Sequence, residues 1–185
     1  LKTRNNKAKG SRSPIQVGAE LFGHSGVESD IEMIELMLEA MHKLALPNIK
    51  MSLGHVEIAS ELMTAADFSK AQRHSLIDIL ERKAIPEYEA FIATLELTAA
   101  LKAPFTELPH MCGDAKTVLA SAKTSLAGVS DVMDQAISHL QSIVDNLAVT
   151  YPIDVHVDMA DMRGYQYHTG VVFACYSGGT LQPIA

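Results

Sequence analysis

The sequence predicts an α+β domain in which helices pack against an antiparallel sheet. Apolar residues recur at helical spacing in the middle of the chain and again over residues 130–150. Short strand-like segments lie before, between and after these helical regions. The predicted order is therefore loop, strand, helix, strand, helical block, long helix and antiparallel hairpin, which is an α+β arrangement.

The length and composition are those of an ordinary soluble globular protein. A chain of 185 residues fits one domain, or one domain with an insertion. Hydrophobic residues make up 48% of the chain and charged residues 20%, so a sizeable core can form. Tryptophan is absent and there are nine methionines, so aliphatic and methionine side chains must fill that core.

The first third of the chain is predicted to form a loop, a strand, a helix and a second strand. Residues 1–13 are polar and rich in turn formers, and residues 15–22 form a plausible short strand. Ser29 and Glu32 have the spacing of a capping box, which predicts a helix over residues 29–45. Alternating apolar and polar residues then predict a half-buried strand over residues 49–56.

The middle of the chain is predicted to be a helical insertion. Between residues 58 and 126 the apolar residues fall at helical intervals, and prolines and glycines divide the region into short helices. The predicted domain organisation is a core made of residues 1–57 and 127–185, interrupted by a helical insertion over residues 58–126.

The last third of the chain is predicted to form a long helix followed by strands. Ser130 is the expected start of this helix, which carries a continuous apolar stripe consisting of Met133, Ile137, Leu140, Val144 and Leu147. Strands are expected over residues 154–158 and 170–176, forming an antiparallel hairpin. Gly178–Gly179 is the expected turn toward a further strand that begins at Thr180.

The distribution of charge argues against broad nucleic-acid binding. The net charge is −7, and the basic residues are concentrated in residues 1–12, which contain five Lys or Arg and no acid. A nucleic-acid-binding domain usually presents a basic face at the scale of the whole domain. The basic segment is best interpreted as a solvated loop, although it could also contact phosphates.

Cysteine usage and hydropathy predict a cytoplasmic protein. Cys112 and Cys175 form no CxxC pair, which favours a reducing compartment. No apolar run approaches the roughly 20 residues that a membrane span needs, and no signal peptide is visible. The chain lacks an initiator methionine and ends just after a predicted strand, so we interpret it as an excerpt of a longer protein.

The segment RGYQYHTG, residues 163–170, is the more informative of two candidate binding motifs. Arg163 could bind a carboxylate or phosphate in bidentate fashion, or could form a surface ion pair with Asp161. Tyr167 and His168 could stack on a planar ligand or bond to it. Adjacent residues of a strand face opposite sides, so at most one of the two should enter a given pocket unless the backbone bulges.

The segment QVGAELFG, residues 16–23, is the second candidate. If it is a strand, Gln16 and Glu20 project from the same face, because residues four apart in a strand do so. The carboxylate of Glu20 could attract an ammonium or imidazole N–H, and the amide of Gln16 could orient an amino group. The alternative is a polar strand face open to water.

Neither a metal site nor a catalytic cysteine is predicted. Asp154, His156 and Asp158 alternate on one strand but span about 13 Å, which is too far for one metal ion to collect. One of these three residues could still line a pocket. Cys112 has His110 nearby but no third group that would complete a nucleophilic site.

The two binding motifs together resemble histidyl-tRNA synthetases, over nearly the whole chain. QVGAELFG resembles the segment after motif 2, in which the family's glutamine and glutamate contact histidine. Arg163–Gly164, with Tyr167 and Phe173, resembles the histidine-specific motif. The resemblance implies a class II aminoacyl-tRNA synthetase-like fold and a histidine site made by Gln16, Glu20, Arg163, Tyr167 and His168.

The departures from the synthetase pattern point to a non-catalytic relative. Motif 2 should read Phe-Arg-x-Glu, but Lys2 stands at the arginine position and Arg4 at the glutamate position. YHTG and GAELFGH are instead similar to the synthetase paralogue that regulates ATP phosphoribosyltransferase in histidine biosynthesis. Motif 3 is expected beyond the end of the chain.

That resemblance implies a regulatory subunit without a cofactor or catalytic residues. Its implied partners are the short-form catalytic subunit of ATP phosphoribosyltransferase, free histidine as feedback inhibitor, and further copies of itself through the synthetase-like core. Neither tRNA nor a membrane is implied as a partner. Two alternatives stay open: an active histidyl-tRNA synthetase, and an amino-acid-binding paralogue that serves another partner.

Overall fold

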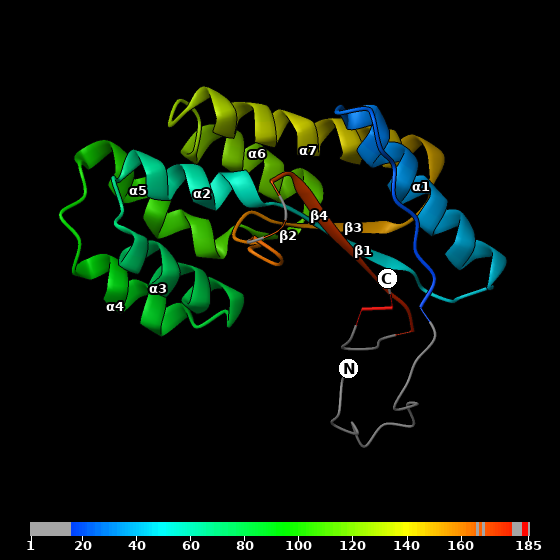
Figure 1. Ribbon diagram of the computed structural model, residues 1–185, viewed down its shortest axis with the longest axis horizontal. Helices are drawn as coiled ribbons and strands as arrows, with labels where there is room; N and C mark the ends of the chain where they lie inside the picture. Colours follow the sequence, from blue (N-terminus) through cyan, green and yellow to red (C-terminus); the bar gives the residue numbers. More distant parts are fainter. Residues whose placement is uncertain (1–15, 166, 168, 179–182, 185) are drawn as a thin grey trace, which may run out of the picture.

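The computed structural model describes residues 16–165, 167, 169–178 and 183–184. The chain forms a mixed sheet covered by helices, which confirms the predicted α+β class (Figure 1). In chain order the elements are α1 Val27–Lys43, β1 Lys50–His55, α2 Val56–Ala65, α3 Lys70–Glu81, α4 Ile85–Ala93, α5 Ala99–Glu107, the 3-10 helix η1 Leu108–His110, β2 Cys112–Asp114, α6 Ala115–Ser125, α7 Asp131–Thr150, β3 Asp154–Asp158 and β4 Val171–Tyr176.

The sheet has the strand order β2-β3-β1-β4. β1 pairs in parallel with β3, where Met51 faces Val155, and antiparallel with β4, where Leu53 faces Phe173. The predicted hairpin between the two strands after the long helix is therefore wrong, and the sheet is not purely antiparallel. β1 lies between them with both its edges paired, and its residues Met51 and Leu53 are buried.

Two strand predictions fail at the margins of the sheet. Residues 16–22 form no strand: none of the described strands pairs with them, and an unpaired strand leaves its backbone groups without partners. Val17 is 97% exposed and Phe22 is 82% exposed, so the apolar residues that suggested a strand are not buried. Conversely, β2 was not predicted, because its three residues are too few to show a period.

The start of α1 also differs from the prediction. The helix begins at Val27 after Gly26, and no side chain caps it. Ser29 therefore lies inside the first turn, where its N–H bonds to the Gly26 carbonyl oxygen and its Oγ lies 2.6 Å from Nδ1 of His24. The predicted capping box at Ser29 is wrong because the helix starts upstream of it.

The region from α2 to α6 is mainly helical, as predicted, and α3, α4 and α5 gather at the end of the molecule away from α1 (Figure 1). Phe68 and Phe105 stack with ring centroids 5.5 Å apart, and the Tyr88 hydroxyl donates to the Phe105 carbonyl oxygen at 2.7 Å. Residues from this region also reach the sheet, because β2 pairs with β3 and α6 packs on β3. The predicted division at residues 58 and 126 stays a prediction.

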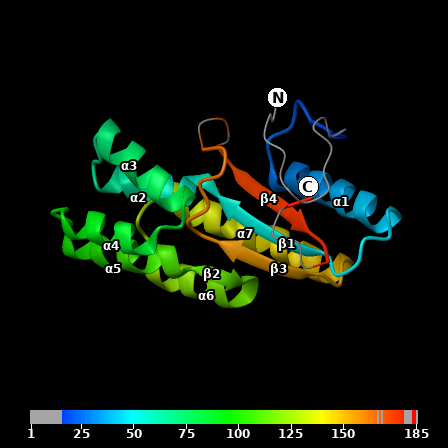
Figure 2. The ribbon, with the colours of Figure 1, turned by 90° about the horizontal axis from the view of Figure 1, so that it is seen from below.

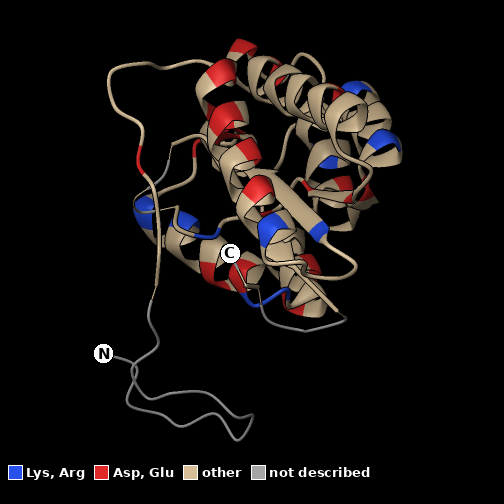
Figure 3. Ribbon diagram, turned by 90° about the vertical axis from the view of Figure 1, so that its right-hand side faces the viewer, with Lys and Arg blue, Asp and Glu red and all other residues tan. Residues whose placement is uncertain are grey.

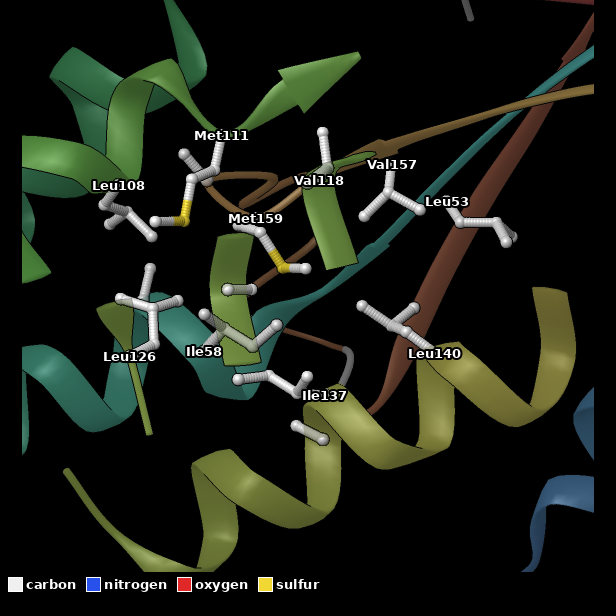
Figure 4. Close-up of a cluster of buried hydrophobic side chains, with 14 of the residues drawn as sticks. Leu53, Ile58, Leu108, Met111, Val118, Leu126, Ile137, Leu140, Val157 and Met159 are labelled. Carbon is white, nitrogen blue, oxygen red and sulfur yellow. The ribbon is translucent and has the colours of Figure 1, made fainter. Parts of the chain in front are cut away.

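A single buried cluster joins the helices to one face of the sheet (Figure 4). Leu53 and Val157 come from the sheet and face Ile137 and Leu140 of α7, while Ile58 comes from α2. All five apolar positions predicted for α7 are buried, so its predicted stripe is confirmed. α7 lies behind the sheet in Figure 2.

Acidic residues lie along the helices at the α1 end of the molecule, which faces the viewer in Figure 3. Glu28 and Asp30 lie in the first turn of α1, where negative charge is favourable. Across the described parts of the chain, no helix is long and apolar enough to cross a membrane. The basic N-terminal segment, with Lys2 and Arg4, and the predicted turn at Gly178–Gly179 and strand from Thr180 lie wholly or partly outside the described residues.

Candidate functional site

Arg163 is held in place by a buried carboxylate at the end of the turn that follows β3. Its backbone N–H donates to Asp161 Oδ1 at 3.0 Å, and its Nε donates to both carboxylate oxygens at 2.9 Å. Nη2 also pairs with Oδ2. The Asp161 side chain is 5% exposed and that of Arg163 is 43% exposed. The ion pair with Asp161, one of the two predicted alternatives, is therefore formed.

This pairing fixes the guanidinium without covering it. Hydrogen bonding to Asp161 is the main cause that raises the pKa of Arg163. Asp161 sits directly against Gly54 of β1, where an added Cβ would lie 2.5 Å from the Asp161 Cβ. Glycine at position 54 is thus what lets the turn carrying Asp161 lie on the sheet.

Arg163 lines two neighbouring cavities. One, of about 320 Å³, is bounded by Arg163, Gly164 and Phe173. The other, of about 200 Å³, lies between the end of α3 and the sheet. Asp158 lines this second cavity, which confirms the expectation that one residue of the alternating trio of β3 borders a pocket.

Tyr167 lies beside α3, away from both of these cavities. Its side chain is 87% exposed, and its N–H donates to the Gly164 carbonyl oxygen at 2.7 Å. It borders a groove of about 490 Å³ together with Tyr165 and the α3 residues Lys70 and Arg73. Its predicted role as a wall of the Arg163 pocket stays a prediction. His168 lies outside the described residues.

Gln16 and Glu20 are exposed residues of the irregular segment that precedes α1. They line neither of the two cavities that Arg163 lines. The structure therefore does not bring the two predicted motifs together within these cavities. The approach of both motifs to one ligand stays a prediction.

Lys83 is a site residue that the sequence did not reveal. It pairs with Asp158 across the 200 Å³ cavity although the two residues lie far apart in the chain. Lys83 lies at the end of α3, inside the predicted insertion, where no motif or spacing marks it. Only the packing of α3 against the turn after β3 places it at the cavity.

The described residues offer no metal centre and no activated thiol. They contain no group of three His, Cys, Asp or Glu side chains able to hold a metal ion. Cys112 and Cys175 are both free, and burial raises the pKa of Cys175 to about 11. Burial is also the main cause that raises the pKa of Cys112, which opposes thiolate formation.

Comparison with known proteins identifies the family. The sequence profile described as histidyl-tRNA synthetase matches residues 1–185 of this chain. The ATP phosphoribosyltransferase regulatory subunit of Hydrogenovibrio crunogenus is 54% identical over 97% of this chain and 46% of its own length. That of Thioalkalivibrio sulfidiphilus is 41% identical over all of this chain and 47% of its own length. The chain thus spans about half the length of these curated relatives.

Solved structures show the same fold. A regulatory subunit/histidyl-tRNA synthetase from Bacillus halodurans superposes with a TM-score of 0.74 at 23% identity, covering 87% of this chain and 42% of that one. A chain of the ATP phosphoribosyltransferase (HisG:HisZ) complex from Thermotoga maritima gives 0.64 at 14% identity, covering 85% and 54%. The predicted synthetase-like fold is confirmed, as is the similarity to the regulatory subunits. The chain belongs to the histidyl-tRNA synthetase family.

Proposed function

We propose that this chain belongs to a non-catalytic regulatory subunit of ATP phosphoribosyltransferase, the first enzyme of histidine biosynthesis. The observation that carries the proposal is the 54% identity, over nearly the whole chain, to a protein named as that subunit. Its partner would be the short-form catalytic subunit, and copies would associate through the synthetase-like core. This role places the protein in the cytoplasm, in agreement with its two unpaired cysteines.

The absence of adenylation chemistry is supported by the N-terminal sequence. Lys2 and Arg4 stand where the synthetases have arginine and glutamate. Reversing the charge at the glutamate position removes a group that helps to hold the synthetase's ligands. The remaining function is binding, and it requires no cofactor.

The ligand in this proposal is free histidine. The guanidinium of Arg163 binds its carboxylate side, Glu20 accepts the imidazole N–H, Gln16 contacts the α-amino group, and Tyr167 and His168 wall the pocket. The firm support for Arg163 from the buried Asp161 favours this role, because a preorganised cation loses little freedom on binding an anion. The proposal requires Gln16 and Glu20, which are exposed in the structure, to approach Arg163 when histidine binds.

Feedback control then follows from linkage. Histidine inhibits if it binds one arrangement of the assembly more tightly than another. A coupling free energy of about 1–3 kcal/mol changes activity roughly 5–150-fold, which is enough for metabolic control.

Arg163→Ala in the full-length protein tests the site. The variant should bind histidine at least about tenfold more weakly by calorimetry, because a hydrogen-bonded charge is lost. Arg82→Ala is the matched control: Arg82 is also half-exposed and paired with carboxylates, Asp78 and Glu87, but lies outside the cavities. Equal affinities in both variants would remove Arg163 from the site.

The synthetase alternative has its own support, because the matching family profile is that of histidyl-tRNA synthetase. Pyrophosphate exchange dependent on histidine and ATP distinguishes the two functions. Robust exchange by the full-length protein would eliminate the regulatory proposal. Co-purification with the short-form transferase separates it from the third possibility, an amino-acid-binding paralogue with another partner.

A further inference from the structure

The backbone at Lys83 has a conformation that glycine normally supplies. Lys83 follows α3 with φ of 53°, in the left-handed region that residues with a Cβ rarely occupy. The Lys83 N–H donates to the Leu80 carbonyl oxygen at 3.0 Å. The Ala84 N–H donates to the Ile79 carbonyl oxygen at 3.1 Å. This is a helix-ending turn in which glycine is the usual residue. Ala45 and Asp67 end α1 and α2 in the same conformation, so the backbone alone does not mark position 83. The contacts of the Lys83 side chain do.

The Lys83 side chain crosses from the helical region to the sheet. Nζ pairs with Asp158, whose side chain is only 12% exposed, and lies 3.4 Å from the Ala160 carbonyl oxygen. Asp158 is fixed in turn, because its Oδ1 accepts the Ala160 N–H at 3.0 Å. An ammonium has three N–H donors, so among the described contacts one donor of Lys83 is left over.

Lys83 and Arg163 border the same 200 Å³ cavity, and each is held by a buried carboxylate. Nε and Nη2 of Arg163 donate to Asp161. Among the described contacts, the N–H groups of Nη1 have no acceptor and can bind a ligand. Two anchored cations with spare donors, together with Glu81 on the same cavity wall, suit a small zwitterion. The cations match a carboxylate, and Glu81 matches an ammonium.

We propose that Lys83 is a ligand-binding residue of the Arg163 site and that it donates to the carboxylate of a bound α-amino acid. This inference rests on the proposed function, in which the amino acid is histidine. It adds that the helical region itself supplies part of the site. Lys83 already connects the corner between α3 and α4 to Asp158 of β3, and a ligand bound by both Lys83 and Arg163 would add a second connection there.

The test uses the full-length protein and two ligands, histidine and histidinol, in which a hydroxymethyl group replaces the carboxylate. In Lys83→Met, histidine affinity should fall about tenfold while histidinol affinity stays unchanged, because only the carboxylate contact is lost. Lys83→Gly should behave alike, and it relieves the backbone conformation rather than straining it. Lys102→Met, at an exposed position of α5, is the control and should bind both ligands like the wild type.

Each outcome has a distinct meaning. If the wild type binds histidine and both Lys83 variants bind it equally well, Lys83 is not in the site and only this inference fails. Equal losses for histidine and histidinol would show a structural role and also overturn it. If the wild type binds no histidine, the proposed function itself fails. Amide exchange gives a further check: histidine should protect the α3–α4 corner in the wild type but not in Lys83→Met.

Discussion

At the scale of single residues, His55 is a buried histidine, and its burial in the folded protein opposes its protonation. It is 3% exposed, its Nδ1 accepts the Glu57 N–H at 3.4 Å in the first turn of α2, and its ring lies 5.7 Å from that of His139. Burial, followed by the charge of His139, lowers the pKa of His55 to about 4. His139 in turn lies 3.0 Å from the Asp30 carboxylate.

The lowered pKa of His55 predicts a loss of stability in acid. An unfolded histidine titrates near 6.5, so between pH 6.5 and 4 the unfolded chain takes up a proton that the folded chain refuses. The contribution is complete above pH 6.5 and is lost progressively as the pH falls from 6.5 to 4, by up to about 3 kcal/mol in total. Urea unfolding from pH 7 to 4.5 should show this slope, and His55→Gln should flatten it. His74→Gln, at an exposed position, should leave the slope unchanged. Identical slopes in the wild type, His55→Gln and His74→Gln would refute the role of His55.

At the scale of elements, the helix starts show what local sequence can and cannot predict. Ser130 was predicted to start α7, and its Oγ does accept the Met133 N–H at 3.1 Å. Ser29 had an equally good local pattern, yet α1 starts two residues before it. The surroundings differ: the Ser130 hydroxyl also donates to the Glu61 carboxylate at 2.8 Å, whereas the segment entering α1 is exposed.

The cap of α7 gives a stability prediction. Ser130→Ala removes the bond to Met133 and also the bond from Ser130 Oγ to Glu61 at 2.8 Å. The variant should lose about 1–2 kcal/mol of unfolding free energy, measured by denaturant titration. Ser138→Ala, in the same helix, removes only a bond to the Asp134 carbonyl oxygen and should be nearly neutral. If Ser130→Ala loses no more unfolding free energy than Ser138→Ala, the capping role of Ser130 is contradicted.

At the scale of the whole molecule, Gly54 couples the sheet to the site. A Cβ at this position would meet the Asp161 Cβ at 2.5 Å and the Asp158 carbonyl oxygen at 3.1 Å. These two acids hold Arg163 and Lys83, so the central strand, the turn and both cations form one packed unit. Fold and candidate site therefore depend on the same contact.

Gly54→Ala should damage stability and ligand binding together. Overpacking should cost about 1–3 kcal/mol, and displacement of Asp161 should weaken histidine binding as well. Gly18→Ala is the control for stability alone, since an added Cβ there meets nothing within 4 Å. Thermal unfolding and calorimetry on the same samples check both effects. If a destabilised Gly54→Ala protein keeps full histidine affinity, the turn that carries Asp161 does not contribute to histidine binding.

The sequence by itself determined the α+β class, the long helix with its buried stripe, three of the four described strands and the family. Periodicity and motifs are local signals, and they survive without knowledge of the fold. Only the tertiary structure decided that β1 lies between β3 and β4, that residues 16–22 form no strand, and that Lys83 faces Asp158. These features depend on which distant segments pair and pack, and no local pattern encodes the partner of a strand edge or of a charged side chain.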